Sequence, residues 1–180
     1  MTRKPTQATS RIGFEKPALT SSGFEDLYRV EMPQLTRFLI RLGASPYEAA
    51  DASHEAFAVA LEKWVTIREP RAWLRTVAHR CYLRQASRRD TPHDPVPDRP
   101  GGTCPIGQIF LHEGNQRVLA ALAQLPPLQR HVMAWTQDGF ADAEIASALG
   151  MNEPAVRKNR SRARLRLQEI LVGEVSSSDE

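Results

Sequence analysis

The sequence predicts an all-α protein made of two small helical domains joined by a proline-rich flexible linker. Apolar residues recur at three- and four-residue steps on both sides of the chain's centre, which is the spacing of amphipathic helices. Residues 91–112 concentrate prolines and glycines, a composition that does not build a packed element. The alternation that marks a half-buried strand is not found in the sequence.

The 180 residues suffice for two very small domains. We expect a disordered N-terminal arm at residues 1–22, a first domain at 23–90, the linker at 91–112, a second domain at 113–173 and a disordered tail at 174–180. The arm lacks the apolar run of a secretory signal, and no stretch reaches the roughly 18 apolar residues that cross a membrane. We therefore expect a cytoplasmic protein without membrane insertion.

The first domain opens with two predicted helices. An apolar stripe begins at Phe24, and Pro33 within it predicts a kink or two short helices. The next helix has a strong start: Ser45 can cap it, Pro46 fits its first turn, and Glu48 completes a capping box. Its apolar stripe consists of Ala49, Ser53, Ala56, Phe57, Ala60, Leu61 and Trp64.

The opposite face of this second helix is acidic. Asp51 and Glu55 lie one turn apart on it, and such a pair is more often a solvated or partner-binding surface than an acid/base pair. We interpret the face as a binding surface, formed by Asp51, His54, Glu55, Ala58 and Glu62.

A helix that begins at Pro70 is as basic as the preceding one is acidic. It carries Trp73 early, and aromatic side chains beside arginines suit unstacked single-stranded bases. A solvated basic face explains the charges alone equally well, and both Trp73 and Trp64 lie on apolar stripes, where core packing is favoured for Trp64 in particular. The nucleic-acid candidates on this helix are Arg71, Trp73, Arg75, His79, Arg80 and Arg84.

The second domain ends in the densest signal of the chain. Six of the ten residues from 157 to 166 are cationic and none is acidic. A short helix, the turn at Gly150 and a cap at Asn152 precede them, which is helix-turn-helix spacing with the basic helix in the recognition position. A solvated basic face is the alternative, and the turn makes DNA binding the better interpretation. The candidate residues are Arg157, Lys158, Asn159, Arg160, Arg162 and Arg164.

The sequence contains no pattern typical of an enzyme. It has no glycine-rich phosphate loop, no nucleophile elbow and no paired-histidine metal motif, and its histidines and cysteines do not follow zinc-site spacing. We expect no catalytic residue, no metal and no cofactor.

These motifs together resemble the extracytoplasmic-function sigma factors, group IV of the bacterial sigma-70 family. The resemblance spans about residues 24–171 and is interrupted at the linker. In the first half it rests on Asp51, residues 55–57 and Trp64, similar to the family's core-binding helix, and on residues 70–74, similar to its −10 helix. In the second half it rests on residues 125–127, 129–130, 144–146, 149–150, 155–156 and 161–167, which resemble region 4.

The resemblance implies a sigma subunit that binds core RNA polymerase and directs promoter-specific initiation. The acidic helix would dock on the β′ clamp helices, and the first domain would hold the melted non-template strand of the −10 element. The second domain would sit on the β flap and read the −35 element as duplex DNA. The sequence leaves open whether an anti-sigma factor binds. The alternative is a free-standing helix-turn-helix regulator, whose first half would be an effector or dimerisation domain.

Overall fold

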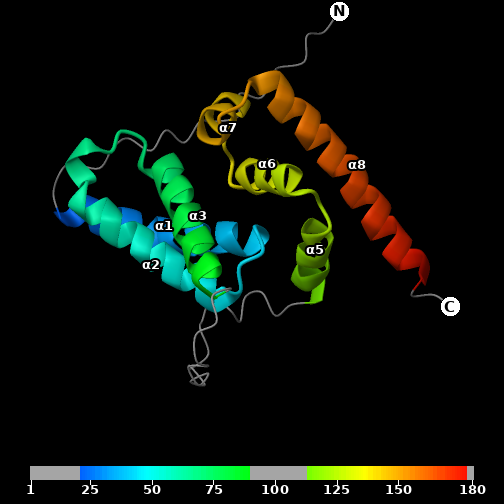
Figure 1. Cartoon of the computed structure of the whole chain (residues 1–180), viewed down its shortest axis with the longest axis horizontal. Coiled ribbons are helices and arrows are strands. Elements are labelled where there is room, and N and C mark those ends of the chain that lie inside the picture. Colours follow the sequence, from blue (N-terminus) through cyan, green and yellow to red (C-terminus); the bar gives the residue numbers. More distant parts are fainter. Residues whose placement is uncertain (1–20, 90–112, 178–180) are drawn as a thin grey trace, which may run out of the picture.

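The computed structural model describes residues 21–89 and 113–177, and within these ranges every regular element is helical (Figure 1). The predicted linker at 91–112, most of the predicted arm and residues 178–180 of the predicted tail lie outside the described residues. The disordered tail expected from residue 174 is corrected, because the last helix continues to Ser177. The first half of the chain contains α1 (Ser21–Arg41), α2 (Pro46–Glu62), the short 3-10 turn η1 (Trp64–Thr66) and α3 (Pro70–Arg89). The second half contains α5 (Glu113–Ala123), α6 (Pro127–Gln137), α7 (Asp142–Leu149) and α8 (Glu153–Ser177).

The predicted interruption of the first helix at Pro33 is wrong insofar as it called for two short helices, because α1 runs unbroken from Ser21 to Arg41. Proline removes one backbone donor and crowds the preceding turn. Here the residues around it are held by packing, since Met32 and Leu35 are both buried in the core. Tertiary packing therefore keeps α1 in one piece where local propensity would break it.

The predicted start of α2 is confirmed. The Glu48 backbone N–H donates to Ser45 Oγ at 3.3 Å, and the Ser45 N–H donates to the Glu48 carboxylate at 2.7 Å. Pro46 occupies the first turn, where its missing N–H removes no helical hydrogen bond. The reciprocal cap fixes where α2 begins, and this sets which of its faces turns toward α1 and α3.

The apolar stripe predicted for α2 is buried in the core except at Leu61, which is 60% exposed. Val118 of α5 and Leu128 of α6 are exposed in the same way, at 43% and 45%. Each lies at the margin of its stripe, where a three- or four-residue step turns the side chain past the helix that covers its neighbours. Trp64, for which core packing was favoured, is buried.

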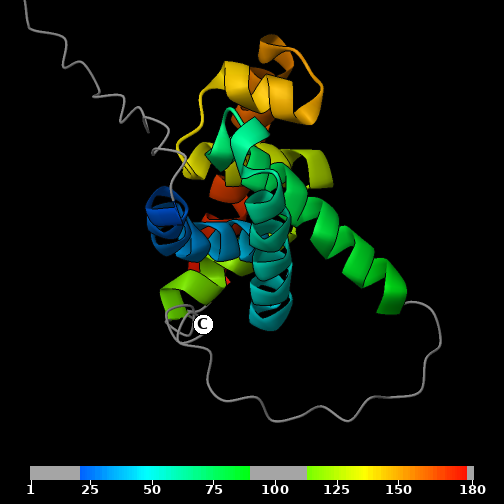
Figure 2. The ribbon, with the colours of Figure 1, turned by 90° about the vertical axis from the view of Figure 1, so that its left-hand side faces the viewer.

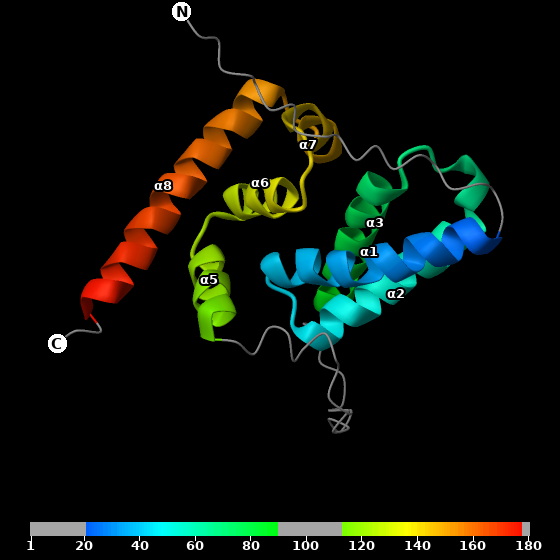
Figure 3. The ribbon, with the colours of Figure 1, turned by 180° about the vertical axis from the view of Figure 1, so that it is seen from behind.

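The two halves pack directly against each other. The C-terminal part of α1 approaches α5 and α6, and α3 approaches α7 (Figure 3). Phe38 of α1 meets Trp135 of α6 edge to face with 5.5 Å between ring centroids, and Trp135 meets Phe140 in the same manner at 4.7 Å. One continuous cluster of buried apolar side chains therefore spans both halves.

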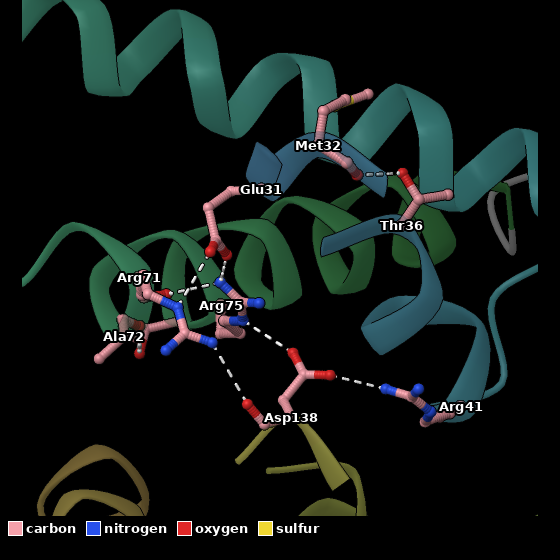
Figure 4. A network of polar contacts seen from close by, with 9 residues as sticks. Glu31, Met32, Thr36, Arg41, Arg71, Ala72, Arg75 and Asp138 are labelled. Carbon is pink, nitrogen blue, oxygen red and sulfur yellow. Dashed lines mark hydrogen bonds and ion pairs between the residues drawn. The ribbon is translucent and has the colours of Figure 1, made fainter. Parts of the chain in front are cut away.

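A buried ionic network, which we call the interdomain network, lies beside these rings (Figure 4). Arg75 of α3 is 0% exposed, and its Nε donates to Asp138 Oδ2 at 2.9 Å while Nη1 donates to the Glu31 carboxylate. Arg41 Nη1 donates to the other oxygen of Asp138 at 2.7 Å. Arg71 Nε donates to Glu31 Oε1 at 3.0 Å and Nη2 donates to the Asp138 carbonyl at 3.3 Å. Asp138 thus connects the second half of the chain to three arginines of the first.

The network corrects the expectation that Arg71 and Arg75 lie on an open basic surface of α3. Both guanidinium groups also stand over the Phe140 ring, 5.2 and 5.4 Å from its centroid. The helical period placed them off the apolar stripe of α3. Asp138 and Phe140 of the second half then cover that side of α3, which the sequence of α3 does not encode.

We predict that Asp138→Ala destabilises the folded chain by about 3–5 kcal/mol, because it leaves the buried charge of Arg75 and the partly buried charge of Arg41 without their shared carboxylate. Chemical denaturation followed by circular dichroism measures the change. The matched control is Asp26→Ala, which removes a carboxylate from an exposed pair with Arg29 and should cost less than about 1 kcal/mol. Equal effects of the two substitutions would contradict the role assigned to the network.

Candidate nucleic-acid and partner interfaces

The helix-turn-helix unit is formed by α7, the turn at Gly150 and α8. Gly150 ends α7 with φ +64°, a left-handed conformation that glycine adopts without a steric cost. Asn152 Oδ1 accepts a hydrogen bond from the Ala155 N–H at 2.9 Å, so the predicted cap of α8 is confirmed. Val156 and Ala163 are fully buried, and Leu167 packs against the same cluster as Ala163. One face of α8 is thus packed against the rest of the second half, so its other faces point to solvent.

The outward faces of α8 carry most of the cationic residues that the sequence singled out. Arg157 forms an exposed pair with Glu153 at 3.4 Å across one helical turn, the kind of contact that a stronger anion displaces readily. The exposed cationic side chains of this helix are Arg157, Lys158, Arg162, Arg164 and Arg166.

Two of the predicted DNA-binding residues on α8 are engaged within the protein. Both terminal nitrogens of Arg160 donate to the carboxylate of Asp142 in α7, and both side chains are less than one quarter exposed. The Asn159 amide donates to the Ala155 carbonyl at 2.9 Å. Arg160 therefore holds α8 against α7 in this structure, which the count of cationic residues could not distinguish from a DNA contact.

The acidic face of α2 is exposed as predicted for Asp51, His54, Ala58 and Glu62. Glu55 differs, because its carboxylate bonds to Arg84 and accepts from Gln85 Nε2 at 3.1 Å, so it connects α2 to α3. Exposed apolar residues lie beside this face: Tyr47 one turn before Asp51, and Leu61 one turn after Ala58. Sequence reasoning missed Tyr47 and had placed Leu61 on the buried stripe. The α2 face is thus a mixed acidic and apolar surface, a composition typical of protein interfaces.

Trp73 and Arg80 of α3 line a groove between α3 and α7 with a volume of about 680 Å³. Ala72 and Val77 contribute apolar wall from α3, and Ala148 contributes it from α7. Trp73 is half-buried, so neither plain core nor full exposure describes it. The later part of α3 extends away from the second half, and Arg84 lies on this part (Figure 2).

His79, the remaining candidate on α3, faces the second half. Its Nε2 lies 3.0 Å from Nε2 of His131 in α6, and the two rings meet edge to face. Burial, followed by the repulsion that a second imidazolium at His131 would exert, lowers the pKa of His79 to about 4. His79 is therefore neutral at physiological pH and lies outside any open basic surface. The contacting residues Glu31, Asp138, Phe140 and His131 were missed because each meets α3 from an element that is distant in the sequence.

Among residues 21–89 and 113–177, no three His, Cys, Asp or Glu side chains group together as they would around a metal ion. In the same part of the chain, no helix has the length and apolar character required to span a membrane.

Comparison with known proteins identifies both halves. Residues 27–91 match the family model described as Sigma-70 region 2, and residues 115–167 match the one described as Sigma-70, region 4. The chain is 30% identical over 158 residues to the RNA polymerase sigma-E factor of Streptomyces coelicolor, covering 83% of this chain and 86% of that protein. It is 35% identical over 136 residues to the ECF RNA polymerase sigma factor SigJ of Mycobacterium tuberculosis, covering 69% of this chain and 43% of SigJ.

Two solved structures share the fold. The sigma factor RpoE of Bartonella quintana, in complex with the anti-sigma factor NepR, aligns with a TM-score of 0.63 at 24% identity over 82% of this chain and 96% of that one. CnrH, in complex with the cytosolic domain of CnrY, aligns with a TM-score of 0.63 at 20% identity over 88% of this chain and 93% of that one.

An acidic and apolar face in the first half, a basic helix-turn-helix in the second and the two matched regions define the class as sigma subunits of bacterial RNA polymerase. The chain belongs to the extracytoplasmic-function sigma factors of the sigma-70 family. It is a sigma subunit that directs transcription initiation, as the sequence predicted.

We predict that Arg160→Ala and Asp142→Ala each destabilise the protein by about 1–3 kcal/mol, because each leaves a half-buried charge without its partner. The double substitution should cost little more than either single one, which a double-mutant cycle of unfolding free energies detects. Arg162→Ala, an exposed arginine on the same helix, is the control and should leave stability unchanged. Additive effects of the two single substitutions would show that Arg160 does not act through Asp142.

Proposed function

We propose that α8 reads the −35 element of promoters as duplex DNA and that α3 holds the melted non-template strand of the −10 element. The observation that carries the proposal is the orientation of α8, whose apolar side is buried while its cationic side chains point outward from a capped helix-turn-helix. Polymerase supplies the chemistry of transcription, and this subunit supplies recognition and strand capture without catalysing a reaction itself. It would do so in the cytoplasm, where polymerase is found.

The residues of α8 divide by their distance from its start. A recognition helix that enters the major groove presents its N-terminal residues to base edges. Arg157 and Lys158 are exposed in the first two turns after the Asn152 cap, so we assign base contacts to them. Arg162 and Arg164 are further along and are assigned to phosphates.

For the −10 element we assign Trp73, Arg80 and Arg84, which the packed arrangement leaves at least partly exposed. Arg71, Arg75 and His79 belong to the same surface of α3, but here they contact Glu31, Asp138 and His131. They would become available to nucleic acid only when the two halves separate.

The α2 face is assigned to the clamp helices of the polymerase β′ subunit. Its support is the combination of exposed carboxylates at Asp51 and Glu62 with exposed Leu61 on the same helix. The region 4 domain would contact the β flap. One of the two similar solved structures is a complex with the anti-sigma factor NepR, which supports an anti-sigma factor as a further partner of this chain.

We predict that Asp51→Arg reduces binding to core polymerase at least tenfold without unfolding the protein, because it places a positive charge in an acidic interface. Asp51 is a better test than Glu55, whose replacement would also break the contact between α2 and α3. The control is Glu25→Arg, the same charge change at an exposed position of α1. Co-purification with core polymerase measures binding, and wild-type yields of the Asp51 variant would refute the assignment.

We predict that the two groups of arginines on α8 fail differently. Arg157→Ala should cost about 1–3 kcal/mol of binding and relax discrimination at one or two −35 positions. Arg164→Ala should weaken binding almost uniformly across sequences and lower the salt slope by about one. Gln168→Ala, an exposed uncharged position on α8, is the control.

The measurement for these variants is transcription by reconstituted holoenzyme on promoters randomised across the −35 element, at two salt concentrations. A change of sequence preference in Arg164→Ala with uniform loss in Arg157→Ala would reverse the orientation proposed for α8 in the groove.

A further inference from the structure

The two histidines that face each other across the interdomain interface form a contact of their own. His79 comes from α3 in the first half and His131 from α6 in the second, and their Nε2 atoms are 3.0 Å apart. At that separation one nitrogen must carry a proton and donate a hydrogen bond, and the other must be unprotonated and accept that bond. The contact therefore requires a particular protonation state, unlike the apolar packing around it.

The surroundings of His131 select that state. Its Nδ1 lies 3.0 Å from the Pro127 carbonyl oxygen, which can only accept a hydrogen bond. Neutral His131 therefore carries its proton on Nδ1 and presents an unprotonated Nε2 to the other ring. His79 then donates from Nε2, and both residues are satisfied while neutral.

The charges nearby do not favour additional protons on the pair. Burial, followed by the repulsion that a second imidazolium at His131 would exert, holds the pKa of His79 at about 4. Burial also lowers the pKa of His131, against the opposing effect of the Pro127 carbonyl and together with that of Arg130. Charged groups on the helices that meet here are Glu31 and Arg41 of α1, Glu55 of α2, Arg71, Arg75 and Arg80 of α3, Arg117 of α5, Arg130 of α6 with Asp138 at its end, and Asp142 and Glu144 of α7.

The carboxylates in this region are committed to other partners. Glu31 and Asp138 accept from the arginines of the interdomain network, and Asp142 holds Arg160. Glu55 is bonded to Arg84, and Glu144 accepts from the Ala141 N–H at 2.7 Å. Protonation of either histidine would therefore place a buried positive charge close to Arg130, and no carboxylate is available to balance that charge.

We propose that the His79–His131 contact is an acid-sensitive latch between the two halves, which proton uptake opens to release the face of α3 that carries Arg71, Arg75 and His79. Only the use of the released face, nucleic-acid binding, rests on the function proposed above. The separation of the two halves is a property of the free chain and does not depend on the proposed contacts with DNA or polymerase.

The direction of the effect follows from linkage. A histidine exposed by opening would titrate near its ordinary pKa of about 6.5, whereas in the packed form His79 titrates at about 4. The open form therefore binds more protons, and packing of the halves is favoured above about pH 6.5 and lost progressively as the pH falls toward 4. For His79 alone, the ratio of packed to open molecules should fall about tenfold between about pH 7.5 and about pH 5.5. His131 shifts the ratio in the same direction.

The test is the distance between the two halves in the free full-length chain, measured by single-molecule fluorescence transfer. Dyes are attached at Lys63→Cys and Gln168→Cys, two exposed positions in different halves, with Cys81→Ala and Cys104→Ser removing the native thiols. In the labelled wild-type chain, the ratio of molecules at the packed distance to molecules at the open distance should fall about tenfold over the two pH units. Asp138→Asn, which weakens the interdomain network without changing the histidines, defines the open distance at neutral pH.

The histidines are tested by the doubly substituted His79→Gln and His131→Gln chain, whose distances should be nearly independent of pH. His54→Gln is the matched control, because this exposed histidine of α2 contacts Tyr28 of α1 within the first half and should leave the wild-type response intact.

The latch is overturned if the labelled wild-type chain keeps one distance across this pH range while Asp138→Asn reports another. It is equally overturned if the double variant retains the wild-type pH response. The titration of the wild-type histidines tests the latch without any substitution at them. The test therefore still holds if the histidine variants fold poorly. Because the measurement contains neither polymerase nor DNA, failure of the proposed promoter contacts would appear separately, as loss of transcription by a chain that still opens with acid.

Discussion

The arrangement of the two halves depends on the burial of one guanidinium group, that of Arg75. A buried arginine must find partners, because an unpaired charge in the interior costs several kcal/mol. Glu31 supplies one partner from the first half and Asp138 supplies the other from the second, and each carboxylate is shared with another arginine. Apolar contacts such as Phe38 with Trp135 tolerate small shifts, whereas this network accepts a single register.

The network is also suited to being broken. A buried ionic contact gains little net free energy over the solvated ions, so it specifies an arrangement without making it permanent. The side chain and backbone oxygens of Asp138 occupy Arg71, Arg75 and Arg41 much as the oxygens of a phosphate would. If Arg71 and Arg75 contact nucleic acid as proposed, they cannot do so while they hold Asp138.

Other binding surfaces remain outside the interface. The cationic side chains of α8 and the α2 face are exposed in the packed form, whereas part of the α3 surface is covered. A chain in this form could meet polymerase through α2 before its −10 surface is free. The proposed conformational control would thus be concentrated at α3, where His79 and Arg75 meet the second half.

The sequence by itself determined most of the helices, the caps of α2 and α8, and the class of the protein, although α1 continues through Pro33 where a break was expected. Ser45 with Glu48, and Asn152 before α8, are local signals that act within one turn, and the steps joining Val156 to Ala163 are local as well. Only the tertiary structure decided which charged residues remain exposed and unpaired with another helix. Arg75, Arg160 and Glu55 have the same helical periodicity as exposed charges, yet each is paired with a residue from another helix. Those pairings depend on how whole helices pack, and helix periodicity carries no information about a partner that is distant in the chain.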